Sequence, residues 1–274
     1  MKRWSWAVWM LVGMLVGMLM GCSAPQREAK PPESAPVSTD GWVRSGPVAL
    51  ATEGDSGEVR LSGIASVHSD SITTVIVSFE DAKGAPTGPP AGSSVVFRPQ
   101  VRVLRVQLPR AVTHWEFTDK RFESGLVSRV FVVRRLDGSI ALDLHLAEAA
   151  SVRALFGDTV APLTLHLRRG GVALPAVADK GSSTVLLWPR PGDDSDTLAI
   201  EGYGRPFEAN VEIHIRGAAP RDTFTNSADY TETWGEFAIR LPRGARGPAD
   251  TLRVGESHMD TGRWLGSTVP LSRH

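Results

Sequence analysis

From Trp42 onward, the chain consists of short segments in which apolar and polar residues alternate, separated by turn-forming residues. Alternation with a period of two predicts strands that have one face buried. The strands predicted in the first part of the chain are 58–66, 72–79, 94–97, 102–108, 126–134, 140–145 and 163–168. Those predicted in the second part are 184–188, 197–203, 209–216, 236–241, 251–256 and 266–271. A short helix is predicted at 148–156, and the Pro- and Gly-rich segment 83–92 is predicted to be a flexible loop.

These elements predict an all-β fold with two β-sandwich domains. The first domain is predicted at 42–175, followed by a linker at 176–183 and a second domain at 184–274. The Asp137-Gly138 pair between two predicted strands is typical of a tight hairpin turn, because glycine accepts the positive φ that such turns need. Six or seven short strands in the last part of the chain are typical of an immunoglobulin-like sandwich.

The residues before the predicted domains have a different pattern. Lys2 and Arg3 precede an apolar run that ends at Gly21-Cys22, and Cys22 is the only cysteine in the chain. The arrangement resembles a bacterial lipoprotein signal peptide, which implies export, removal of residues 1–21 and acylation of Cys22. Met20 departs from the small or β-branched residue usual at its position. Two or more acyl chains hold a protein stably at a membrane.

An uncleaved transmembrane anchor is the alternative interpretation, because the apolar run reaches the length that spans a bilayer. No cluster of basic residues follows Cys22, which favours the lipoprotein interpretation. Residues 22–41 form a Pro-rich segment predicted to be a disordered tether between the membrane and the first domain. Ser23 is not aspartate, so that in a host with two membranes the expected location is the outer membrane.

The charges of the chain are nearly balanced. Removing residues 1–21 takes away two of the 30 basic side chains and leaves 28 basic against 30 acidic ones. A nucleic-acid-binding domain would instead have a basic patch and a high isoelectric point, so no nucleic-acid partner is predicted. An acylated Cys22 leaves no thiol for a disulfide, and the fold has to be held together by its core.

The C-terminal region resembles a known immunoglobulin-like module. The matching segments are Trp188-Pro189-Arg190-Pro191-Gly192, the stretch from Ile200 to Val211 with its Phe-Glu-Ala-Asn-Val block, 234–237, 252–257 and 262–271. They are similar to the domain of bacterial spore-germination and related envelope proteins called Gmad2. The resemblance covers 184–271 and implies an immunoglobulin-like sandwich. No germination-type partner domain stands beside it, so a role in germination is not implied.

The first domain is similar to the AMIN group of envelope β-domains, through the segments 63–67, 74–79 and 163–167. Members of that group are associated with peptidoglycan or with the placement of cell-wall machinery. The alternative is a β-sandwich of no assigned family.

No catalytic or metal-binding motif stands out, and no cofactor is predicted. None of the seven histidines, at 68, 114, 145, 166, 214, 258 and 274, has the close spacing of a zinc site. His258 and Asp260 are adjacent to a predicted strand and lack a converging nucleophile. The acidic run 193–196 lacks the spacing of a calcium loop and is interpreted as a solvated turn.

Five tryptophans follow Cys22, and exposed tryptophan is a common contact residue for ligands and partner proteins. Trp188 and Trp234 are predicted to fill the core of the second domain. Trp115 and Trp264 are the candidate ligand-binding residues.

Together these features predict a non-catalytic envelope lipoprotein that binds or scaffolds a wall polymer such as peptidoglycan, or an envelope protein. An accessory subunit of a membrane transport or germination-like assembly is the alternative. A hydrolase with an unrecognised site would require converging polar side chains in a cleft.

Overall fold

The computed structural model describes residues 41–50, 57–156, 161–175, 179–181, 183–193, 195–229, 233–242, 244, 247 and 250–271. Cys22, the predicted signal peptide 1–21 and the predicted tether, apart from Gly41, lie outside the described residues. Within the described ranges, no helix is long and apolar enough to cross a membrane.

The described part of the chain is built from strands and two short 3-10 turns, which confirms the predicted all-β fold class. The first strands are β1 (Gly46–Leu50), β2 (Val59–Ser69), β3 (Ile72–Asp81), β4 (Pro86–Thr87), β5 (Ser94–Arg98), β6 (Val103–Leu108), β7 (Val112–Trp115), β8 (Asp119–Arg121), β9 (Val127–Arg134), β10 (Ile140–Leu146), β11 (Ala150–Leu155) and β12 (Leu163–Arg169). The remaining strands are β13 (Asp179–Lys180), β14 (Thr184–Trp188), β15 (Thr197–Gly204), β16 (Asn210–Arg216), β17 (Arg221–Asn226), β18 (Trp234–Pro242), β19 (Thr251–Gly255) and β20 (Ser267–Pro270). The 3-10 turns are Pro99–Val101 and Phe207–Ala209.

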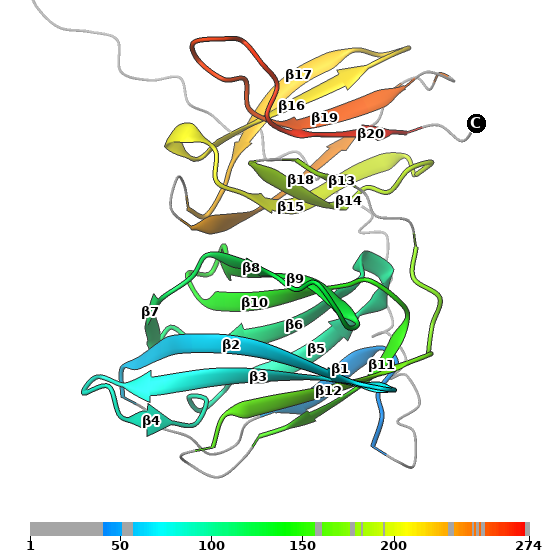
Figure 1. The fold of residues 1–274 in the computed structure, drawn as a ribbon. Coiled ribbons are helices and arrows are strands. Elements are labelled where there is room, and N and C mark those ends of the chain that lie inside the picture. The colour runs from blue at the N-terminus through cyan, green and yellow to red at the C-terminus, as the bar shows by residue number, and fades with distance from the viewer. Residues whose placement is uncertain are drawn as a thin grey trace, which may run out of the picture. The chain divides into compact units, whose positions relative to one another are not determined.

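Strands β1–β12, called the N-terminal half below, form two layers. The six-stranded sheet β11-β12-β3-β2-β7, with β4 beside β3, faces β1-β5-β6-β10-β9, with β8 beside β9. Figure 1 shows β2, β3 and β12 in one layer and β5, β6, β9 and β10 in the other. The apolar positions of the alternating strands, such as Val77, Val106 and Leu142, point inward and form one large core.

Strands β13–β20, called the C-terminal half, form a second pair of layers. The sheet β17-β16-β19-β20 packs against β18-β15-β14-β13, and Ile200, Ile213 and Val254 belong to the core between them. The predicted boundaries of domains 42–175 and 184–274 remain predictions.

The two halves share one sheet. Strand β18 pairs in parallel with β9 through Trp234↔Val133 and Gly235↔Arg134, so that β1-β5-β6-β10-β9-β18-β15-β14-β13 is continuous. A third apolar cluster covers this junction and takes Phe131 and Val133 from one half and Tyr203 and Trp234 from the other. Where the halves meet, the face of the shared sheet that points away from the core of each half is therefore buried as well.

Buried polar side chains connect the halves at the same place. Arg105 binds Asp143 through two nitrogens, at 2.7 and 2.8 Å, and reaches Glu236 of the C-terminal half at 2.9 Å. Burial alone would lower the pKa of Arg105, but the charges and hydrogen bonds of Asp143 and Glu236 raise it above the ordinary value. The side chain is therefore a permanent cation placed between two carboxylates.

Most predicted strands are present, but the helix predicted at 148–156 is wrong. Residues Ala150–Leu155 form β11, which pairs with β12 and is fixed at Val152 by two backbone hydrogen bonds to Val43. Ala150 and Val152 are buried in the core, so that pairing in the sheet outweighs the helix propensity of the alanines. The predicted loop at 83–92 contains the two-residue strand β4, which pairs with β3.

The buried phenol of Tyr203 should make the stability of the folded protein fall at alkaline pH. Its hydroxyl contacts His145 Nε2 inside the junction, and burial, followed by the charge of Asp143, raises the pKa of Tyr203 well above the ordinary value of 10.0. Above about pH 10 the unfolded chain releases this proton while the folded chain retains it, so that stability falls as pH rises. We expect the fall to be less steep in Tyr203→Phe by up to about 1.4 kcal/mol per pH unit, measured by urea unfolding between pH 9 and 11. Equal slopes in the two proteins would contradict the buried placement of the phenol.

Candidate ligand-binding site

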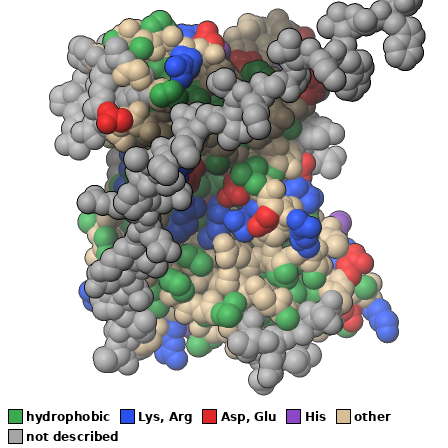
Figure 2. All heavy atoms as spheres, turned by 180° about the vertical axis from the view of Figure 1, so that it is seen from behind, with side chains coloured by type: hydrophobic (Ala, Val, Ile, Leu, Met, Phe, Trp, Pro, Cys, Tyr) green, Lys and Arg blue, Asp and Glu red, His purple; other side chains and the backbone are tan. Residues whose placement is uncertain are grey.

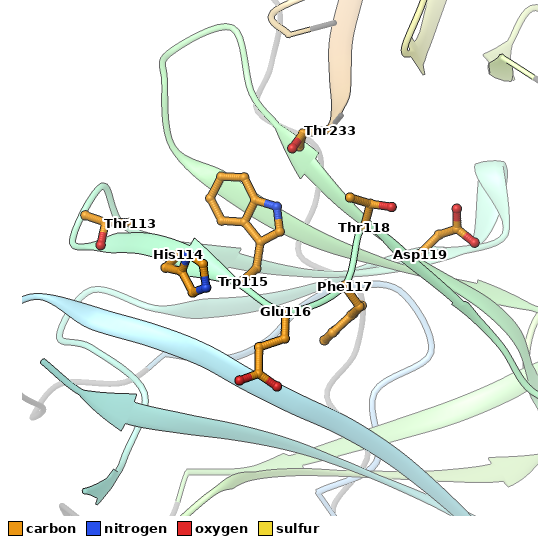
Figure 3. Close-up of a pocket in the computed structure, with 8 residues that line it drawn as sticks. All are labelled: Thr113, His114, Trp115, Glu116, Phe117, Thr118, Asp119 and Thr233. Carbon is orange, nitrogen blue, oxygen red and sulfur yellow. The ribbon is translucent and has the colours of Figure 1, made fainter. Parts of the chain in front are cut away.

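An open pocket with a volume of about 510 Å³ lies where the chain crosses between the layers of the N-terminal half. Strand β7 belongs to the six-stranded sheet. Strand β8 pairs with β9 in the sheet that the two halves share, and residues 116–118 connect β7 to β8. Thr233, directly before β18, forms the wall contributed by the C-terminal half (Figure 3). The described residues that line the pocket are Thr113, His114, Trp115, Glu116, Phe117, Thr118, Asp119 and Thr233.

Trp115, one of the two tryptophans predicted to bind a ligand, lies in this pocket. Its indole is half-buried and packs against the N-terminal core. Figure 3 shows the ring directed toward Thr233, whereas the side chains of Glu116 and Phe117 point the other way. The Arg134 guanidinium lies 5.3 Å from the ring centroid and also binds Asp229 at 2.8 Å. The ring is thus held in place from both halves of the chain.

The segment that carries Asp229 is packed tightly onto β18. A Cβ atom on Gly235 would lie 2.1 Å from the Asp229 backbone nitrogen, so only glycine allows this approach. The backbone nitrogen of the neighbouring Ala228 donates a hydrogen bond to the backbone carbonyl of Glu236. The carboxylate that holds Arg134 over Trp115 is therefore positioned by the start of β18.

Asp119 has structural partners on both sides. Its carboxylate binds Arg129 at 2.9 Å and accepts a hydrogen bond from Trp234 Nε1 at 3.4 Å. The Arg129 guanidinium in turn lies 4.4 Å from the Phe131 ring centroid. This carboxylate is oriented by two donors, which makes it a fixed acceptor at the edge of the pocket and ill suited to act as a mobile base.

Trp264, the other predicted ligand-binding residue, lies elsewhere, in the segment between β19 and β20. It is half-buried, Arg253 lies 4.4 Å from its ring centroid, and His214 touches its edge at 5.4 Å between centroids. Its Nε1 is buried and has no hydrogen-bond partner among the described residues. The structure therefore does not bring Trp115 and Trp264 into one site.

An arginine guanidinium lies against each of the five tryptophans that the structure describes. Besides Trp115 and Trp264, the pairs are Arg168 with Trp42, Arg190 with Trp188, and Arg205 with Trp234. Such contacts contribute about 0.5–1 kcal/mol each at exposed sites. Trp234 is fully buried, but its place is the junction, whereas the sequence predicted that it fills the core of the second domain. Trp188 is partly buried beside the same cluster.

Three of the described histidines contact neighbouring side chains of the fold. His145 is buried against Tyr203 and Phe131, and His166 hydrogen-bonds Thr74 on the neighbouring strand at 3.2 Å. His214 contacts Glu212 at 3.0 Å and Asp222 at 2.8 Å on the outer face of the C-terminal half. Within the described ranges, no three His, Cys, Asp or Glu side chains converge as metal ligands. His274 lies outside those ranges.

The two remaining polar segments form local turns. Asp193 accepts a hydrogen bond from the Ser195 backbone at 3.0 Å, as in an Asx turn, and Asp194 lies outside the described residues. His258 begins a turn closed by backbone bonds to Arg263 and Gly262, and its Nδ1 has no partner among the described side chains.

The sequence singles out Trp115, which stays a predicted ligand-binding residue, but not the other residues that line the pocket. The run His114-Trp115-Glu116-Phe117-Thr118-Asp119 combines aromatic, acidic and hydroxyl groups, and that density is the signal that could have indicated a site. Thr233 and Asp229 lie about a hundred residues further along the chain, and no local pattern connects them to Trp115.

Comparisons with models of known protein families, with curated proteins and with solved structures gave no match for this chain.

Proposed function

We propose that the protein is a non-catalytic lipoprotein of the cell envelope that binds a wall polymer through the Trp115 pocket. The observation that carries the proposal is an indole that packs on the core and against Arg134 in an open pocket whose described lining is mostly polar. Aromatic side chains that are fixed before binding, with a few polar groups around them, are typical of binding sites.

The sequence supports the location in this proposal. A basic start, an apolar run and Gly21-Cys22 favour export and acylation of Cys22, and the Pro-rich tether would carry the folded part away from the bilayer. Figure 2 shows basic side chains interspersed with acidic and apolar ones on the face it presents. Such a mixture is unlike the basic surface that attracts nucleic acid. The similarity to Gmad2 and AMIN domains agrees with an envelope role. We propose both the similarity and the role.

The accessory-subunit alternative has a specific observation in its favour. Among its described residues, the C-terminal half exposes three large apolar side chains, Phe207, Phe224 and Met259, and exposed apolar groups are common in contacts between proteins. Under this alternative the protein would copurify with an integral membrane protein and would have no affinity for wall material.

One experiment separates the two functions. Full-length protein purified in detergent is incubated in parallel with purified peptidoglycan and with solubilised envelope proteins. We expect it to sediment with peptidoglycan. Capture of one defined membrane protein, without sedimentation, would contradict the proposal and favour the accessory subunit.

A further inference from the structure

We propose that the Trp115 pocket binds an uncharged glycan segment across the junction of the two halves. This inference rests on the proposed function, because it names the part of the wall polymer that enters the site. The ligand would lie on the indole of the N-terminal half and reach the hydroxyl of Thr233 in the C-terminal half (Figure 3).

The chemistry of the lining matches the two kinds of surface on a sugar ring. An indole offers a flat apolar face, which suits the C–H face of a sugar. The lining also contains the hydroxyl groups of Thr118 and Thr233, which can donate and accept hydrogen bonds, and that of Thr113, which donates its proton to Glu58 and can accept. Apart from Trp115 and Phe117, none of the described lining residues has an apolar side chain, so a purely apolar ligand would leave the polar groups of the pocket unpaired.

The charges around the pocket argue against an anionic ligand. Among the described residues of the lining there is no lysine or arginine, whereas Glu116 and Asp119 belong to it. Two arginines beside lining residues each bind a carboxylate: Arg134, next to Trp115, binds Asp229, and Arg129 binds Asp119. A phosphate-rich polymer or the carboxylates of a peptide would therefore find no unpaired lysine or arginine among the described residues of the lining.

The junction keeps the two walls of the pocket together. Thr233 precedes Trp234, which is fully buried against Phe131 at 4.9 Å between ring centroids and donates its indole hydrogen to Asp119. The β9–β18 pairing begins at the same tryptophan. Because these contacts fix Thr233 and Asp119 relative to each other, binding would require little rearrangement of the protein, which favours affinity.

The test is a calorimetric titration of the full-length protein in detergent with three soluble probes. They are a tetramer of N-acetylglucosamine as the uncharged glycan, a short polyphosphate as the anion and an oligolysine peptide as the cation. We expect saturable binding of the glycan tetramer alone. Trp115→Ala should weaken it by about tenfold or more, as truncation of a central aromatic contact does.

Further variants separate loss of contact from loss of fold. Trp115→Phe keeps an aromatic face and should retain part of the affinity, while Thr233→Val and Thr118→Val remove single hydroxyl groups at nearly constant shape. Trp264→Ala is the matched control, because Trp264 is also half-buried beneath an arginine but lies outside the pocket. We expect Thr233→Val to weaken binding severalfold and Trp264→Ala to leave it unchanged.

The possible failures are distinguishable. Sedimentation with peptidoglycan but no binding of the glycan tetramer would overturn this inference and leave the proposed function standing. If neither occurs, both fail. Binding of polyphosphate or oligolysine in place of the tetramer, or tetramer affinity that is lowered by Trp264→Ala but not by Trp115→Ala or Thr233→Val, would also overturn the inference.

Discussion

Replacing Arg105 by methionine is expected to lower the free energy of unfolding by about 3–5 kcal/mol, the usual cost of breaking a buried ion pair. Arg105 forms an ion pair with Asp143, whose side chain is completely buried. Without the guanidinium, this carboxylate would be left in the junction with its charge uncompensated. Glu236 keeps a second cation, Arg135, at 3.7 Å. Unfolding in urea, followed by circular dichroism, measures the change.

An exposed pair provides the matched control for this prediction. Arg169 and Glu148 form an ion pair at 2.7 Å, but their side chains are 71% and 49% exposed. Arg169→Met should therefore cost less than about 1 kcal/mol. The double variant with Arg105→Met and Asp143→Leu should regain most of the lost stability, because it removes both buried charges. A cost of Arg105→Met no larger than that of Arg169→Met would show that the junction is open to water.

Replacing Cys22 by serine is expected to abolish acylation of the protein, because serine has no thiol to carry the lipid. Cys22 is the only cysteine, so no other thiol can substitute for it. Cells grown with a labelled palmitate analogue should incorporate the label into the wild-type protein and not into Cys22→Ser. Mass spectrometry of the wild-type protein should find residues 1–21 removed.

The alternative to acylation at Cys22 is an uncleaved transmembrane anchor, and the same two measurements would reveal it. A wild-type protein that keeps residues 1–21 and carries no label would establish the uncleaved transmembrane segment instead. Thr39→Ala serves as the control, since it changes one residue of the predicted tether and should leave both label and processing unchanged.

The alternating pattern predicts most of the longer strands but not what covers them. In β10, with the sequence Ile-Ala-Leu-Asp-Leu-His-Leu, alternation correctly predicts a strand and places Asp143 and His145 on the face opposite Leu142 and Leu144. That face would be solvated in an isolated sandwich. In the structure it lies under the C-terminal half, and all seven residues are buried. Local sequence does not contain this information, because the partners are far along the chain.

Edge strands and short strands were the elements that the pattern missed. Strand β17, Arg-Asp-Thr-Phe-Thr-Asn, lies at the edge of its sheet and has few apolar residues, so its alternation is weak. Strands β7 and β8 are only four and three residues long, yet they frame the pocket. Trp115 was predicted as a ligand-binding residue from its residue type alone, whereas its partners Arg134 and Thr233 emerged only from the three-dimensional contacts.

Binding of a wall polymer at the Trp115 pocket is tested most directly by sedimentation with purified peptidoglycan, comparing wild-type, Trp115→Ala and Trp264→Ala proteins of confirmed fold. We predict that the wild-type protein and Trp264→Ala sediment to the same extent and that Trp115→Ala remains in the supernatant. Equal sedimentation of all three proteins, or of none, would contradict the account.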